Sequence, residues 1–280
     1  MLTERLVATV VVRDGWVVQS FGFQRYLPVG HPEVAVEFLA QWNVDEIVLL
    51  DISATRDGRG PDFALVERVA RRCFVPLTVG GGIRHLDDVH DLTHAGADKV
   101  SVNTTALARP ALLEEGASHY GRQCMVVSID VRGEGAAARV WSRCGTEATD
   151  RGPVEWAQAA ERSGAGEVLL TSIDRNGSKR GYDVAAIRAV SEAVGVPVIA
   201  SGGVGRPEHF VEGLREGKAS AVAAGNYFHF TEHSVMVTKS ALLGQGAAVR
   251  ISGGRPYVAA PVDGQGRVGR VADFTFDERS

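Results

Sequence analysis

The sequence has few of the residues that would place it in several protein classes. Its only cysteines, Cys73, Cys124 and Cys144, are far apart and odd in number. This pattern predicts reduced thiols in a cytosolic protein rather than a disulfide framework or a metal site. Basic residues are not in excess, since 30 Lys and Arg stand against 34 Asp and Glu, for a net charge of −4. The chain therefore lacks the basic footprint of a nucleic-acid-binding protein.

Long apolar runs are also lacking. No uninterrupted run is long enough for a membrane helix, and the first residues lack the cationic start of a signal peptide. We therefore expect a soluble, cytoplasmic protein without a membrane partner. Neither a phosphate-binding P-loop pattern nor an HExxH zinc motif occurs, so neither ATP consumption by this chain nor a bound cofactor or metal is expected.

The chain does contain a regular alternation of short apolar runs and segments of helical period. Eight candidate strands begin near Leu6, Glu46, Pro76, Lys99, Cys124, Glu167, Pro197 and Ala221, and a helical pattern follows each. Several of these helical patterns start at proline and end at glycine, which suits a first helical turn and a C-terminal cap. The fold class predicted by this count is α/β, a (β/α)8 TIM barrel over residues 1–251.

An internal repeat divides the predicted barrel. VLLDISA (48–54) resembles VLLTSID (168–174), and VPLTVGGGI (75–83) resembles VPVIASGGV (196–204). Similarity at a fixed long period indicates two copies of a four-stranded half, about 1–122 and 123–251, which must close one barrel together. The Gly-rich segment 252–280 falls outside the repeat and is predicted to be an appended tail.

Glycine-rich strand ends predict two related anion sites. In such barrels the chemistry lies at the C-terminal ends of the strands, where glycine lets backbone N–H groups approach a phosphate. A turn-forming role would explain one such glycine pair, but two pairs in equivalent positions favour a ligand with a phosphate at each end, or one long phosphorylated ligand. The predicted substrate- and phosphate-binding residues are Gly81, Gly82, Asn103, Thr104, Thr171, Gly177, Ser201, Gly202, Gly203, Ala224 and Gly225.

Several segments together resemble one known family. The similar stretches, in register from Met1 to about Arg250, are RLVATVVVRDG, DEIVLLDISAT, PLTVGGGIR, GADKVSVNT, VVSIDVRG, GAGEVLLTSIDRNGSKRGYD, IASGGVG and AAGNYFHF. They resemble the synthase (cyclase) subunit of imidazole glycerol phosphate synthase. The resemblance implies a heterodimer with a glutaminase subunit, whose ammonia travels through the barrel to a phosphorylated small-molecule substrate.

The resemblance also implies an ammonia gate at the opposite end of the barrel. Arg5, Glu46, Lys99 and Glu167 stand at the family's gate positions. Buried charges of this kind must be paired, and a paired ring could form a polar plug that opens. The alternative is an ion-pair cluster that only stabilises this end of the barrel. Asp98 matches a position at which the family meets its glutaminase.

The family's ring closure implies two carboxylates, one at the end of strand 1 and one at the end of strand 5. Asp130 matches the second, and Val11 occupies the place of the first. Because valine cannot move protons, and loss of one proton-transfer group typically costs about 10²–10⁴-fold in rate, we expect the original cyclisation to be impaired. Gln19, Asn176 and Cys144 also replace a lysine, an acid and a hydroxyl of the family near the substrate.

Three functions remain open at this point. The segments GWVVQSFGFQRYLPVG and AAGNYFHFTEHSVMVTKS resemble a diverged branch of the family linked to sugar amidation. That branch implies a nucleotide-sugar substrate and a further partner, an ATP-dependent sugar amidotransferase. The second possibility is a genuine cyclase subunit of histidine biosynthesis that tolerates Val11. The third is a non-catalytic scaffold that activates a glutaminase.

Overall fold

A computed structural model describes residues 4–229 and 234–250 of the chain. The predicted tail, 252–280, lies outside the described residues. Eight strands form the central ring: β1 (Arg5–Arg13), β4 (Glu46–Asp51), β5 (Leu77–Gly80), β6 (Lys99–Val102), β7 (Met125–Arg132), β10 (Glu167–Ser172), β11 (Val198–Ser201) and β12 (Ala221–Ala224). Each begins within one residue of its predicted start.

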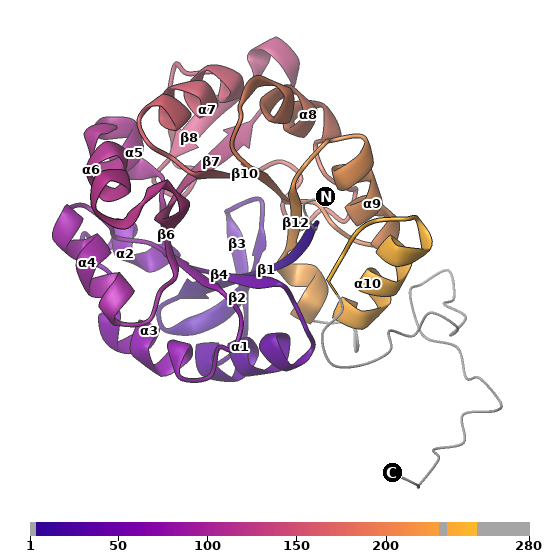
Figure 1. Ribbon diagram of the computed structural model, residues 1–280, viewed down its shortest axis with the longest axis horizontal. Helices are drawn as coiled ribbons and strands as arrows, with labels where there is room; N and C mark the ends of the chain where they lie inside the picture. The colour runs from indigo at the N-terminus through magenta and orange to yellow at the C-terminus, as the bar shows by residue number, and fades with distance from the viewer. Residues whose placement is uncertain (1–3, 230–233, 251–280) are drawn as a thin grey trace, which may run out of the picture.

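The ring is a closed, parallel β-barrel. Its strands follow the order β1-β4-β5-β6-β7, and β7 pairs with β10, β10 with β11, β11 with β12 and β12 with β1. The helices form an outer layer around this ring, as Figure 1 shows looking down the barrel. The predicted (β/α)8 fold class is therefore confirmed. All eight strands run the same way, so their C-terminal ends meet at one rim.

Local chemistry starts the helices near the predicted residues. Pro32, Pro153 and Pro207 stand in the first turns of their helices, where the missing N–H has no intrahelical partner to lose. The Asp62 and Asp183 carboxylates accept backbone N–H groups of the first turns that they cap. The outer helices are α1 (Pro32–Gln41), α3 (Phe63–Ala70), α4 (Leu86–His94), α6 (Ala111–Tyr120), α7 (Pro153–Arg162), α8 (Val184–Ala193), α9 (Pro207–Arg215) and α10 (Ser234–Gly244).

Two β-hairpins and two short helices extend this plan and were not predicted. The hairpins are β2 (Trp16–Phe21) with β3 (Arg25–Gly30), and β8 (Arg139–Ser142) with β9 (Glu147–Ala148); the helices are α2 (Ile52–Arg56) and α5 (Thr104–Ala108). β2 pairs antiparallel with β1, and β8 with β7. The first strand of each predicted half therefore carries an antiparallel extension at the C-terminal rim.

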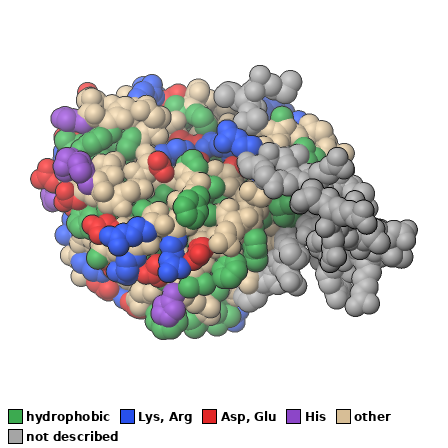
Figure 2. Space-filling view, turned by 60° about the horizontal axis from the view of Figure 1, so that its bottom comes forward, with side chains coloured by type: hydrophobic (Ala, Val, Ile, Leu, Met, Phe, Trp, Pro, Cys, Tyr) green, Lys and Arg blue, Asp and Glu red, His purple; other side chains and the backbone are tan. Residues whose placement is uncertain are grey.

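The outer surface has no single-sign patch on the face shown in Figure 2, where basic and acidic side chains are interspersed. Some of them join neighbouring helices, since Arg68 of α3 pairs with Glu33 of α1, and Arg72 after α3 pairs with Glu37. Exposed pairs of this kind contribute little to stability. Within the described ranges, no helix is both long and apolar enough to cross a membrane.

The backbone just before β10 lies very close to the backbone at the start of β7. The Gly166 N–H donates to the Met125 carbonyl over 2.9 Å, and a Cβ built on Gly166 would lie 2.0 Å from the Arg122 carbonyl oxygen. The neighbour is backbone and cannot rotate away. By contrast, a Cβ on Gly30 would meet nothing within 4 Å.

Gly166→Ala should therefore lower the free energy of unfolding by about 1–3 kcal/mol, because the methyl group forces β7 and β10 apart. Gly30→Ala serves as the matched control and should change it by less than about 0.5 kcal/mol. Chemical denaturation monitored by circular dichroism measures both. Equal effects of the two substitutions would contradict the conclusion that the packing of β10 against β7 requires glycine at position 166.

Candidate active site

Asp130 lies on β7 at the C-terminal rim, with its side chain only 8% exposed. Its carboxylate Oδ2 accepts a hydrogen bond from Asn103 Nδ2 over 2.8 Å. Burial raises the pKa of Asp130 to about 7, because a dry environment disfavours the charged form. The hydrogen bond from Asn103 acts in the opposite direction. Asp130 can consequently exist in both protonation states near neutral pH, which suits a group that takes up and returns protons.

Val11 lies on β1 and places an isopropyl group in the same cavity as Asp130. It pairs with Leu50 of β4 and Val18 of β2, so apolar residues surround it. Asp51, another carboxylate that lines this cavity, is held by Arg59 over 2.6 Å. Asp130 is thus the one lining carboxylate among the described residues without an ion pair.

The cavity has two lobes. The first has a volume of about 130 Å³ and the second about 200 Å³. Residues common to both linings make them continuous across the barrel mouth: Thr9, Val11, Ser20, Asn176 and Ser201. The predicted phosphate-binding residues divide between them. The first lobe takes Gly81, Gly82, Asn103, Thr104 and Thr171, and the second takes Gly177, Gly202, Gly203, Ala224 and Gly225.

Buried polar atoms line this cavity without a protein partner among the described residues. They are Thr9 Oγ1, Ser20 Oγ, Ser101 Oγ, Asn103 Oδ1 and Asn176 Oδ1. The great majority of buried polar groups in proteins have a hydrogen-bond partner. These five oxygens therefore have unused hydrogen-bonding capacity at the cavity wall.

The two lobes differ in charge, although their glycine loops are equivalent in the repeat. Asp51 and Asp130 line the first lobe, and none of its described lining residues is basic. Lys179 lines the second lobe, and none of its described lining residues is acidic. Gln19 is 3% exposed and also lines the second lobe. The second lobe is thus the more favourable of the two for an anion.

Both hairpins contribute residues that cover the first lobe. Phe23 and Tyr26 of the β2–β3 hairpin line this lobe together with Cys144 of the β8–β9 turn. A Cβ built on Gly145 would lie 3.0 Å from the Phe23 ring, so the hairpins touch. Burial raises the pKa of Cys144 to about 11, which keeps its thiol protonated near neutral pH. Sequence reasoning missed the roles of Phe23, Tyr26 and Lys179.

The sequence contains a signal for the turn from β1 into β2. Asp14 and Gly15 form this two-residue turn with φ values of 52° and 80°, and Asp-Gly between apolar runs favours a turn of this left-handed type. The Asn226 side chain, just after β12, holds β2 at the C-terminal rim through two hydrogen bonds to Ser20. Its Oδ1 accepts the Ser20 N–H over 3.0 Å and its Nδ2 donates to the Ser20 carbonyl over 2.8 Å.

The four predicted gate residues meet at the opposite end of the barrel. Lys99 Nζ lies 3.0 Å from Glu46 and 2.7 Å from Glu167. Arg5 lies 2.7 Å from Glu46 and also pairs with Glu167. The carboxylates are almost fully buried, with Glu46 1% and Glu167 4% exposed. Each charge is compensated by two partners, as burial requires.

Alternate residues along the strands connect this ion-pair cluster to the cavity. On β1, Arg5 belongs to the cluster, Val7 to an apolar layer, and Thr9 to the cavity lining. β10 repeats the order with Glu167, Leu169 and Thr171. The apolar layer also contains Val48, Val126, Ile199, Ala221 and Ala223. The barrel centre is therefore a packed apolar wall between two polar ends.

Asp98 lies just before β6, at the same end as the ion-pair cluster. Its side chain is exposed, and its Oδ2 accepts the Leu77 N–H over 2.8 Å. Over the part of the chain that the structure describes, no group of three or more His, Cys, Asp or Glu side chains is arranged to hold a metal ion.

Known proteins similar to this chain share its whole barrel. A family model described as "Histidine biosynthesis protein" matches residues 5–234. The imidazole glycerol phosphate synthase subunit HisF of Geobacillus kaustophilus is 46% identical over 252 residues, which are 89% of this chain and 100% of that protein. A Vibrio vulnificus protein named "Putative imidazole glycerol phosphate synthase subunit hisF2" is 42% identical over 267 residues, 95% of this chain and 98% of that protein.

The raised pKa of Asp130 predicts a pH-dependent stability. The folded state keeps this proton up to about pH 7, whereas the ordinary value is 3.8, so the unfolded state loses it near pH 4. Between these limits the folded state binds more protons, and the free energy of unfolding of the wild type falls as pH rises. An asparagine at position 130 has no carboxyl group to titrate, so it removes this pH dependence.

The stability of Asp130→Asn relative to the wild type should therefore increase from pH 5 to pH 8, by about 2–3 kcal/mol. Denaturant titrations at both pH values measure the difference. Asp150→Asn, at an exposed position, is the control and should show no such increase. A difference for Asp130→Asn that stays constant with pH would contradict the assigned burial effect.

Proposed function

Because the chain belongs to the histidine biosynthesis protein family and is HisF-like, we propose that it is the ammonia-accepting subunit of a two-component glutamine amidotransferase. A glutaminase partner would release the ammonia, and this chain would add the nitrogen to a phosphorylated small molecule. The observation that carries the proposal is a two-lobed cavity that combines Asp130, two glycine loops and five buried oxygens with unused hydrogen-bonding capacity.

The layered barrel interior supports a route for neutral ammonia. Glutaminase docking at the end that carries Asp98 would bring ammonia to the ion-pair cluster of Arg5, Glu46, Lys99 and Glu167. Beyond it, the apolar layer at Val7 and Leu169 offers no charge or hydrogen bond. A small neutral molecule can cross such a layer as side chains fluctuate, whereas an ion would pay a large desolvation cost.

Asp130 is proposed as the acid/base group of the reaction. With its pKa near 7, it can accept a proton from the attacking nitrogen and later return it to a leaving oxygen. Val11 on β1 has no acidic group, so it cannot perform a second proton transfer from the other side of the cavity. The proposed reaction therefore needs one protein carboxylate rather than two, and the family's ring closure is expected to be slow.

For the substrate we propose a nucleotide-linked sugar, within a branch of the family linked to sugar amidation. An ATP-dependent sugar amidotransferase would then be a further partner. The proposal is supported by the changes at Val11, Gln19 and Asn176, which all face the cavity. The second candidate is a genuine cyclase subunit of histidine biosynthesis, favoured by the 46% identity to HisF of Geobacillus kaustophilus.

Complementation separates the two candidates. In a histidine auxotroph that lacks its own synthase subunit, the wild-type chain should not restore growth, because Val11 removes one proton-transfer group. The double variant Val11→Asp with Gln19→Lys should restore growth at least partly. Adding Asp130→Asn to that double variant is the control and should abolish it. Growth supported by the wild-type chain would establish the cyclase candidate instead.

Nitrogen transfer can be measured directly in the purified complex with its glutaminase. With amide-¹⁵N glutamine and a sugar nucleotide, mass spectrometry should detect the label in the sugar product, and Asp130→Asn should reduce the rate by about 10²–10⁴-fold. No glutamine-dependent label in any product would count against the proposal. Unchanged transfer by Asp130→Asn would favour a scaffold that performs no chemistry.

A further inference from the structure

The loop after β10 carries three basic residues beside the second lobe. Arg175, Lys179 and Arg180, called here the basic rim, fall within six positions. Lys179 lines the second lobe directly, and both Lys179 and Arg180 are exposed. Their charges face solvent at the edge of the glycine loop of Gly202 and Gly203, where an anion would enter.

The basic rim is held tightly against that glycine loop. The Gly181 N–H donates to the Gly203 carbonyl over 2.8 Å. A Cβ on Gly203 would lie 3.0 Å from the Cβ of Arg175, and one on Gly205 would lie 2.6 Å from the Cβ of Lys179. Lys179 itself adopts a left-handed backbone with φ of 60°. Such conformations cost energy in residues other than glycine.

Acidic side chains do little to neutralise the basic rim. The Lys179 ammonium forms no ion pair or hydrogen bond with another described residue, and the Arg180 guanidinium reaches only the Asp174 carbonyl oxygen, over 3.5 Å. Arg175 lies 3.6 Å from Glu134, whose side chain is 79% exposed. The Asp174 carboxylate instead accepts the Gly133 N–H over 2.9 Å.

Two basic side chains beside the first lobe, by contrast, are closely paired. Arg59 lies 2.6 Å from Asp51, and Arg56 lies 2.7 Å from Asp57. Three cations gathered without such partners repel one another, so their arrangement favours an external anion. One phosphate in the glycine loop would leave the outermost charges of the basic rim without a partner.

We propose that the second lobe and the basic rim together bind a diphosphate group. The glycine loop would take the inner phosphoryl group, and Lys179 and Arg180 would take the outer one through charge-assisted hydrogen bonds. The ligand class is a sugar or nucleoside carried on a pyrophosphate linkage. This inference rests on the proposed function of the second lobe as an anion site, and it places the ligand's charge at one end of the cavity rather than at both.

The test is isothermal titration of the full chain with inorganic pyrophosphate and with orthophosphate, in metal-free buffer of constant ionic strength. Pyrophosphate should bind at least about tenfold more tightly, a difference of about 1.4 kcal/mol. The double variant Lys179→Met with Arg180→Gln should lose this preference and bind both ions within about twofold of each other.

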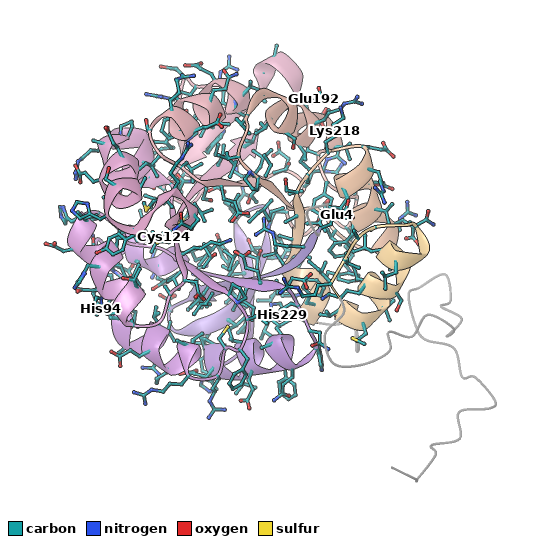
Figure 3. The ribbon with its side chains drawn as sticks, in the orientation of Figure 1. Glu4, His94, Cys124, Glu192, Lys218 and His229 are labelled. Carbon is teal, nitrogen blue, oxygen red and sulfur yellow. The ribbon has the colours of Figure 1, made fainter. Side chains whose placement is uncertain are left out.

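A matched control removes the same charge far from the cavity. Lys218 and Arg188 both pair with Glu192, and Figure 3 shows Lys218 and Glu192 on the outer circumference of the barrel. Lys218 also shares the left-handed backbone of Lys179, with φ of 55°. Lys218→Met with Arg188→Gln should therefore keep the preference for pyrophosphate.

Each other result has a definite meaning. Equal affinity of the wild type for the two ions would overturn the diphosphate inference and leave a monophosphate site in the second lobe. Loss of the preference in the control variant would also overturn it, because the effect would then come from net charge. If neither ion binds the wild type, both this inference and the phosphate site in the proposed function are overturned.

Discussion

Closure of the parallel sheet is the constraint on which the rest of the structure depends. Pairing of β7 with β10 and of β12 with β1 leaves no open edge in the ring. It also sorts side chains by depth, because alternate residues of each strand face inward. Charged residues then collect at one end, apolar residues in the middle, and a polar cavity at the other end. The site is thus a consequence of strand direction and register.

Much of this arrangement could be predicted from the sequence. Buried parallel strands are short apolar runs, and proline and glycine mark the helix limits, so elements such as α7 were readable. The hairpins were missed, although Asp14-Gly15 signalled the turn that leads from β1 into β2. The charge difference between the lobes could not be read from the sequence, because Asp51 reaches the cavity from the end of β4 and Lys179 reaches it from the loop after β10, far apart in sequence. The ligand roles of the glycine loops and the division into halves remain predictions.

β1 and β7, the first strands of the two predicted halves, differ in the residue that each places in the cavity. Both strands keep a hairpin extension, and each hairpin holds an arginine over an aromatic ring, Arg13 on Tyr26 and Arg132 on Trp141. The cavity-lining residues of the two strands differ in chemistry: β1 carries Val11 at the position where β7 carries Asp130. Similar architecture can thus carry unequal chemistry, because packing depends on size and pattern while proton transfer depends on one functional group.

The mutual pairing of Arg5, Glu46, Lys99 and Glu167 has an electrostatic consequence. Any single neutral replacement would leave one net charge in this cluster, although each remaining charge would keep a partner. A second replacement, of opposite charge, would restore neutrality. The quartet can persist for this electrostatic balance alone, so its presence by itself does not identify the reaction that the protein performs.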